Sequence, residues 1–257
     1  MRDPESIGSI TAVPGIRVGD DWLTGVSMVL PDSGTVAGVD VHGGSPGTHE
    51  TDALDPRTLV QTIDALTLTG GSASGLVSAH GVQKWCAGHG FGFRVGSHTD
   101  AVVPILPAAA IFDRRRGGVF SAHPTIEMGY QAAAAAYASE PFAPTQRGNV
   151  GAGTGAAISG GRFKGGVCSA ALRLPAPNHD IVVGAIAIVN AVGTPWDAGF
   201  DTDDLIPPSM RLPADSASAP AFNTTIAAVA TNVILDGIAS AASVTTPVAK
   251  FPKYREM

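Results

Sequence analysis

The pair Asn223-Thr224 has residue types that could do chemistry on the chain itself. It lies in "PAFNTTIAAVATN", residues 220–232, where a loop marked by proline gives way to an apolar run. If the bond between the two residues broke, Thr224 would carry a free α-amine beside its own hydroxyl. An α-amine has a pKa of about 8, so near neutral pH it can accept the hydroxyl proton. Such an amine is a known activator of a threonine nucleophile.

The break itself needs only the same hydroxyl. Thr224 would attack the carbonyl of Asn223 to form an ester, which water then hydrolyses. The preceding residues 199–223 are acidic and then rich in Pro, Ser and Ala, which predicts a loop that would let the cut ends separate. An ordinary turn before a strand explains the pair as well, because Asn is common in turns and Thr in strands. From these residues alone, the turn is the simpler interpretation.

Composition excludes several classes of function. The formal net charge of −6 argues against a nucleic-acid partner, and the one basic run, Arg114 to Arg116, is interpreted as a solvated loop. With 44% hydrophobic and 15% charged residues, 257 residues can bury a sizeable core. The two cysteines, Cys86 and Cys168, make neither a disulfide framework nor a zinc set.

The location of the protein is predicted from two further features. Residues 1–20 contain no apolar core of a signal peptide. The longest apolar run, residues 181–193, is too short to cross a bilayer and contains Asn190. A cytoplasmic protein without a membrane partner is expected.

Hydrophobic periodicity and turn residues predict an α+β fold rather than a doubly wound sheet. A helix is expected to begin at Asp55-Pro56, with Leu59, Ile63 and Leu66 on one face. Another is expected after Thr125, which would serve as its N-cap. The predicted elements are strands joined by hairpins over 15–44, helices over 55–71, 74–90 and 125–140, an extended segment over 101–113, and strands over 165–174, 180–193 and 224–235.

Three partial motifs fail, so no cofactor and no metal is predicted. The segment 151–156 fits G-x-G-x-x-A, but no helix follows it and Arg173 stands where an acid is needed. The segment 70–75 lacks the lysine of a phosphate-binding loop, and Ala73 occupies the place of a nucleophilic serine. The segment 49–52 lacks the spacing of a metal site and is interpreted as a hydrogen-bonded turn.

Seven stretches, in this order, resemble the family of L-aminopeptidase/D-esterases, which includes β-peptidyl aminopeptidases and nylon-oligomer hydrolases. The resemblance covers nearly the whole chain, and the glycine-rich second stretch and the "FNTTI" junction are its most specific parts. The stretches are 15–19, 34–56, 68–82, 102–113, 148–156, 164–170 and 222–232.

The resemblance implies a four-layer αββα sandwich similar to that of N-terminal-nucleophile hydrolases, with its own connectivity. It also implies self-cleavage and assembly into homo-oligomers, often tetramers. Residues 1–257 would form one domain, divided into an α-chain (1–223) and a β-chain (224–257). The expected substrates are short peptides, amino-acid amides or esters, and ω-amino-acid oligomers.

The resemblance also implies site residues, in the matched stretches and, for Asn190, in the segment 187–193. Thr224, freed from Asn223, would be the nucleophile, and Lys164 matches a family lysine near it. Asn190 matches an asparagine that helps to hold the oxyanion, a role that suits an amide donor. Without the resemblance, Lys164 would be interpreted as a solvated turn residue and Asn190 as a hydrogen-bonded residue at a strand end. The block 70–75 places Gly71 and Ser74 at the substrate.

Two departures from the family bear on activity. Ser74 stands where the family usually has a tyrosine, and a serine is too short to supply the same hydroxyl without a rebuilt pocket. The family also has a segment with a "DGDT"-type motif after the nucleophile strand, and this segment is not found here. Its carboxylates would orient the α-ammonium, whereas Asp236 and Glu256 are the only acids after Thr224.

Three functions therefore remain open. The first is a self-processing amide hydrolase. The second is an uncleaved, inactive scaffold or partner subunit, which the two departures favour. The third is an acyltransferase like ornithine acetyltransferase, which also uses a threonine exposed by self-cleavage.

Overall fold

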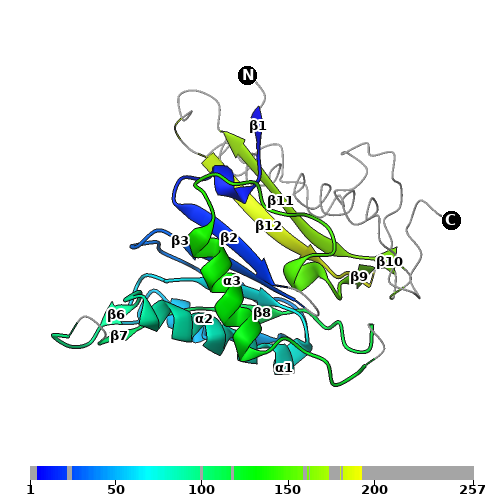
Figure 1. Cartoon of the computed structure of the whole chain (residues 1–257), viewed down its shortest axis with the longest axis horizontal. Coiled ribbons are helices and arrows are strands. Elements are labelled where there is room, and N and C mark those ends of the chain that lie inside the picture. The colour runs from blue at the N-terminus through cyan, green and yellow to red at the C-terminus, as the bar shows by residue number, and fades with distance from the viewer. Residues whose placement is uncertain are drawn as a thin grey trace, which may run out of the picture.

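The computed structural model describes residues 5–21, 25–98, 101–116, 119–158, 161, 163–173, 180 and 182–192. Within these ranges the chain forms two larger sheets and two long helices (Figure 1). The strands are β1 Glu5–Gly8, β2 Ile16–Asp21, β3 Val26–Pro31, β4 Thr48–His49, β5 Leu66–Thr69, β6 Phe93–Arg94, β7 Val102–Val103, β8 Ala108–Ala110, β9 Ala157–Ile158, β10 Phe163–Lys164, β11 Gly166–Arg173 and β12 Val182–Val189. The helices are α1 Ser72–Gly75, α2 Val77–Gly88 and α3 Ile126–Ala138, with 3₁₀ turns η1 Ile10–Ala12, η2 Thr51–Leu54 and η3 Gly151–Gly153.

The first sheet has the order β2-β3-β5-β8-β4, and only the β5–β8 pair is parallel. Strand β3 is buried along its whole length, so both of its faces are covered. Val26, Met28 and Leu30 alternate onto the face that packs against α2 and α3. Ser27 points the other way, where its hydroxyl accepts the Ala152 N–H of η3 at 3.1 Å.

Helices α2 and α3 cover the first sheet and cross closely (Figure 1). A Cβ on Gly81 would lie 1.8 Å from the Ile126 carbonyl oxygen, and a Cβ on Gly129 would lie 1.8 Å from the Ser78 carbonyl oxygen. The two backbones therefore touch at positions where only glycine fits. Thr125 caps α3 by accepting the Met128 N–H at 3.3 Å, as predicted.

The second sheet has the order β1-β11-β12, and β11 and β12 pair antiparallel from Gly166↔Val189 to Arg173↔Val182. The 3₁₀ turn η3 contacts β11 as well as β2, β3 and β5, so it joins the two sheets. The described residues thus form helix, sheet and sheet layers of an α+β fold. The prediction of a second helical layer, which would complete the αββα sandwich, falls on residues outside the described ranges.

The predicted helix over 55–71 is wrong. Arg57 donates its backbone N–H to the Asp55 carboxylate at 2.9 Å, and the Thr58 hydroxyl bonds backbone carbonyls, including that of Asp55 at 2.8 Å. These local side-chain bonds compete with helical hydrogen bonding and close turns instead. Leu59 is 85% exposed, and Leu66 begins strand β5.

The hairpin predicted over 15–44 is confirmed for β2 and β3, but residues 32–44 form no strand. The helices expected over 74–90 and 125–140 correspond to α2 and α3, and the strands over 165–174 and 180–193 correspond to β11 and β12. The loop over 199–223 and the strand over 224–235 lie outside the described residues. Where the chain is described, no helix has both the length and the hydropathy needed to cross a membrane.

Candidate active site

Three predicted site residues, Gly71, Ser74 and Asn190, meet at one loop. This loop, residues 112–116, follows β8 and is called the arginine loop below. Gly71 donates its N–H to Asp113, Ser74 accepts a bond from Arg114, and Asn190 accepts one from Arg116. The arginine loop therefore brings together the turn after β5 and the end of β12.

Gly71 is required by backbone geometry. It has a φ of 77°, in the left-handed region that side chains rarely adopt, and it directly precedes α1. A Cβ there would lie 2.6 Å from His123 Cβ and 2.7 Å from Pro124 Cδ. Its N–H donates to Asp113 Oδ1 at 2.6 Å, which ties the turn to the arginine loop.

Asp113 is the buried acid of the site. It is 5% exposed, and its Oδ2 has no hydrogen-bond partner among the described residues. Burial raises the pKa of this carboxyl, while the Gly71 N–H and the charges of Arg116 and Arg114 partly oppose the rise. Gly155 packs against the second oxygen so closely that a Cβ would lie 2.1 Å from it.

Arg116 fixes the orientation of the Asn190 amide. Asn190 Oδ1 accepts bonds from Arg116 Nη1 and from the Ala157 N–H, the latter at 3.1 Å. The Asn190 Nδ2 donates to the Phe112 carbonyl at 3.2 Å. Since a side-chain amide nitrogen has two hydrogens, one N–H has no acceptor among the described residues and could bind another. Arg116 is half-buried, and burial lowers its pKa while the Asp113 charge raises it.

The remaining predicted residues are placed only in part. The backbone of Lys164 in β10 pairs with Ala157 in β9, the residue whose N–H bonds Asn190. Lys164 thus lies on the strand next to the Asn190 contact. Thr224 and Asn223 lie outside the described residues.

The interpretation of Arg114 to Arg116 as a solvated loop is wrong for two of the three residues. Arg115 is exposed, but Arg114 and Arg116 are partly buried and hydrogen-bonded to predicted site residues. One signal could have found them. The run follows directly after the predicted extended segment that ends at Asp113, and loops at strand ends often carry functional side chains.

The structure also bears on two of the failed motifs. The segment 151–156 leads into β9 and not into a helix, which confirms that it is no dinucleotide fingerprint. Glu50, within the segment 49–52, accepts the Leu106 N–H at 2.8 Å, as a residue of a hydrogen-bonded turn.

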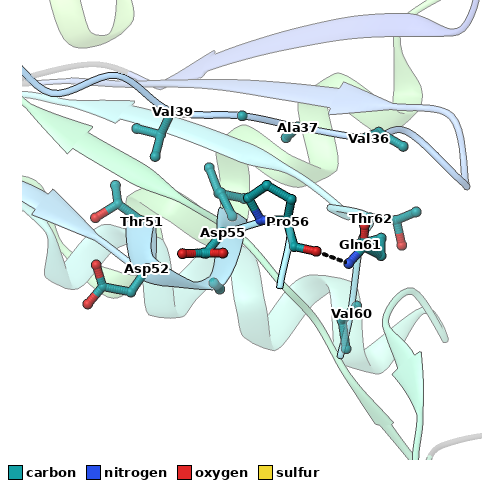
Figure 2. Close-up of a pocket in the computed structure, with 13 residues that line it drawn as sticks. Val36, Ala37, Val39, Thr51, Asp52, Asp55, Pro56, Val60, Gln61 and Thr62 are labelled. Atoms are coloured by element: carbon teal, nitrogen blue, oxygen red, sulfur yellow. Dashed lines mark hydrogen bonds between the residues drawn. The ribbon is translucent and has the colours of Figure 1, made fainter. Parts of the chain in front are cut away.

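A pocket of about 690 Å³ lies elsewhere, between residues 36–39 and the turns over 51–62 (Figure 2). Figure 2 shows Asp52 and Asp55 at its wall, and Gln61 donating to the Pro56 carbonyl at 2.8 Å. Hydrogen bonds from the side chain and the backbone N–H of Arg57 lower the pKa of the Asp55 carboxyl, so this acid is held as a carboxylate. None of the predicted site residues lines this pocket, and its walls supply no nucleophile paired with a base. The arginine loop is therefore the better candidate for the active site.

Solved structures share the fold. The β-aminopeptidase of Burkholderia sp. aligns with a TM-score of 0.53 and 24% identity, over 74% of this chain and 54% of that one. The L-aminopeptidase D-Ala-esterase/amidase of Ochrobactrum anthropi, whose structure is described as a variant of the Ntn hydrolase fold, aligns with a TM-score of 0.53 and 19% identity. That alignment covers 74% of this chain and 55% of that one. The aligned part of the chain thus spans about half the length of these structures.

Sequence comparison identifies the family. An uncharacterized aminopeptidase of Mycobacterium tuberculosis is 40% identical over 259 residues, which cover 89% of this chain and 71% of the relative. An uncharacterized aminopeptidase of Mycobacterium leprae is also 40% identical, over 89% of this chain and 68% of the relative. The sequence profile of peptidase family S58 matches residues 8–242. The chain belongs to peptidase family S58.

Proposed function

We propose that the chain is a self-processing amide hydrolase of the aminopeptidase type, with Thr224 as its N-terminal nucleophile. The observation that carries the proposal is the meeting of Gly71, Ser74 and Asn190 at the arginine loop, in a chain of a peptidase family. Its 40% identical relatives are named aminopeptidases, which supports the reaction class.

Processing would come first. The Thr224 hydroxyl attacks the Asn223 carbonyl, the peptide nitrogen leaves as the α-amine of Thr224, and an ester joins the two residues. Water then hydrolyses the ester and leaves Asn223 with a carboxylate. Residues 1–223 and 224–257 would remain together as the α-chain and β-chain of one domain.

Turnover would reuse the same groups. The α-amine accepts the hydroxyl proton as Thr224 attacks the scissile carbonyl, and then passes it to the leaving amine. The free N–H of Asn190 stabilises the oxyanion, and its fixed orientation means that little reorganisation is needed during the reaction. Lys164 would lie near the nucleophile, as the family resemblance implies, and water releases the acyl group.

The proposed substrates are short peptides, amino-acid amides or esters, and ω-amino-acid oligomers. The names of the relatives and of the matched structures support peptide and amide substrates. The working form would be a homo-oligomer.

The test is hydrolysis of a set of aminoacyl p-nitroanilides by the purified chain. Wild type should release p-nitroaniline, Thr224→Ala should release none, and the neighbouring Thr225→Ala should stay active as the matched control. Asn190→Ala should lower kcat by about 10²- to 10³-fold, the usual effect of removing one oxyanion donor. Equal rates of p-nitroaniline release by wild type and Thr224→Ala would contradict the role of Thr224 as the nucleophile.

An uncleaved scaffold subunit is the second candidate, and Ser74 in place of the family tyrosine favours it. This candidate predicts no turnover from wild type under any of these conditions. An acyltransferase is the third, and it predicts faster acyl transfer to an added amine than to water.

A further inference from the structure

Arg114 and Ser74 form a pair of hydrogen-bond donors beside the candidate active site. Arg114 Nη2 donates to Ser74 Oγ, and Arg114 Nη1 donates to the Phe120 carbonyl at 2.8 Å. The guanidinium carbon lies 5.2 Å from the centre of the Phe120 ring, at a distance suited to a cation–π contact. Three contacts thus hold the guanidinium in one place.

Both groups keep donors for a further acceptor. The Ser74 oxygen accepts from Arg114, and its hydroxyl hydrogen has no acceptor among the residues that the structure describes. A guanidinium has five N–H groups, and within the same residues the bonds to Ser74 and Phe120 use two of them. Ser74 is exposed, so a ligand can reach the pair from solvent.

The local charge also favours an anion. In the described part of the chain, no carboxylate lies within ion-pair distance of Arg114, Arg115 or Arg116. The nearby acid, Asp113, is buried, and its carboxylate offsets part of the charge of Arg116 and Arg114. Three arginines facing one acid leave this loop locally positive in a chain of net charge −6.

We propose that Arg114 and Ser74 bind the terminal carboxylate of the substrate, so that the enzyme prefers short peptides with a free carboxylate over their carboxamides. This inference rests on the proposed function, because it places the pair beside the reacting carbonyl. A guanidinium with a neighbouring hydroxyl can bond both oxygens of a carboxylate. Arg114 is two residues from Arg116, which holds Asn190, so the carboxylate-binding pair and the proposed oxyanion donor are both held by the arginine loop.

The test measures binding without turnover. The probe is a dipeptide analogue with a methyleneamine in place of the scissile amide, prepared as the free acid and as the carboxamide. Calorimetric titration of the full chain should show the acid binding about tenfold more tightly than the carboxamide. Added salt should weaken acid binding and leave carboxamide binding nearly unchanged.

Variants assign the preference to the pair. Arg114→Gln should bring the ratio of the affinities for acid and carboxamide close to one. Arg114→Lys should keep part of the preference, since an ammonium retains the charge but lacks the paired N–H donors of a guanidinium. Ser74→Ala, at an exposed position that leaves the fold intact, should lower the ratio by a smaller factor. Arg94→Gln, at another exposed arginine, removes the same charge and should leave the ratio unchanged.

Three results would overturn the proposal: equal binding of acid and carboxamide by wild type, no binding of either, or an unchanged ratio in both Arg114→Gln and Ser74→Ala. The ratio should persist in Thr224→Ala, which has no nucleophile. If acid binding is preferred but no hydrolysis occurs, the carboxylate site stands and the proposed function fails.

Discussion

Asn190 is the residue whose surroundings say most about the candidate site. Its amide oxygen is engaged by Arg116 and by the Ala157 N–H, so the amide nitrogen must face the other way. A purely structural asparagine at a strand end could be satisfied by backbone groups alone. Here a partly buried arginine side chain also bonds the amide oxygen. The contact therefore makes Arg116 a positioning residue for the proposed oxyanion donor.

Arg116→Met should lower kcat by about tenfold or more with little change in KM, because Asn190 would lose its fixed orientation. Arg115→Met, at the exposed neighbour, is the matched control and should match wild type. Steady-state kinetics on an aminoacyl p-nitroanilide measures both.

A double-mutant cycle separates positioning from general damage. If Arg116 acts through Asn190, Arg116→Met should cost almost nothing further in the Asn190→Ala background. Additive losses would contradict the positioning role.

Residue-level prediction from sequence was limited by contacts between distant positions. Gly71 and Ser74 could be named from a matched stretch, and Asn190 from a family asparagine matched in the segment 187–193. The partners Arg114 and Arg116 could not, because their contacts span 40 and 74 residues of sequence and depend on the fold. Ser74 is shorter than the family tyrosine. In the structure its hydroxyl accepts a hydrogen bond from Arg114, a contact that the sequence alone did not reveal.

At the scale of elements, the sequence predicted those helices and strands whose residue types favour the element that forms. The alanine-rich α3 was predicted from its helix propensity and its Thr125 cap, and β12 from its continuous apolar run. The segment 55–71 has apolar residues at helical spacing, yet Asp55 and Thr58 bond the local backbone and prevent a helix there. Periodicity alone could not reveal this competition.

Gly81→Ala should destabilise the fold by about 1–3 kcal/mol or more, because the added Cβ would meet the backbone of α3 at 1.8 Å and push the helices apart. Gly88→Ala is the control on the same helix. A Cβ there meets nothing within 4 Å, so stability should be unchanged or rise by up to about 1 kcal/mol. Urea denaturation compares them, and equal unfolding free energies would contradict the close helix crossing.

For the whole molecule, the layered arrangement explains how distant stretches build one site. Strand β3 lies between the helices and η3, and the arginine loop joins the first sheet to the end of β12 in the second. The resemblance predicted the α+β fold class. The division into two chains, the nucleophile and the homo-oligomer stay predictions, since the described residues end before Asn223.

Intact-mass analysis of the purified chain after prolonged incubation tests the central claim of self-processing most directly. Wild type should yield two fragments, residues 1–223 and 224–257, while Thr224→Ala should remain a single full-length species. Full-length wild-type chain alone, or the same two fragments from Thr224→Ala, would contradict the account.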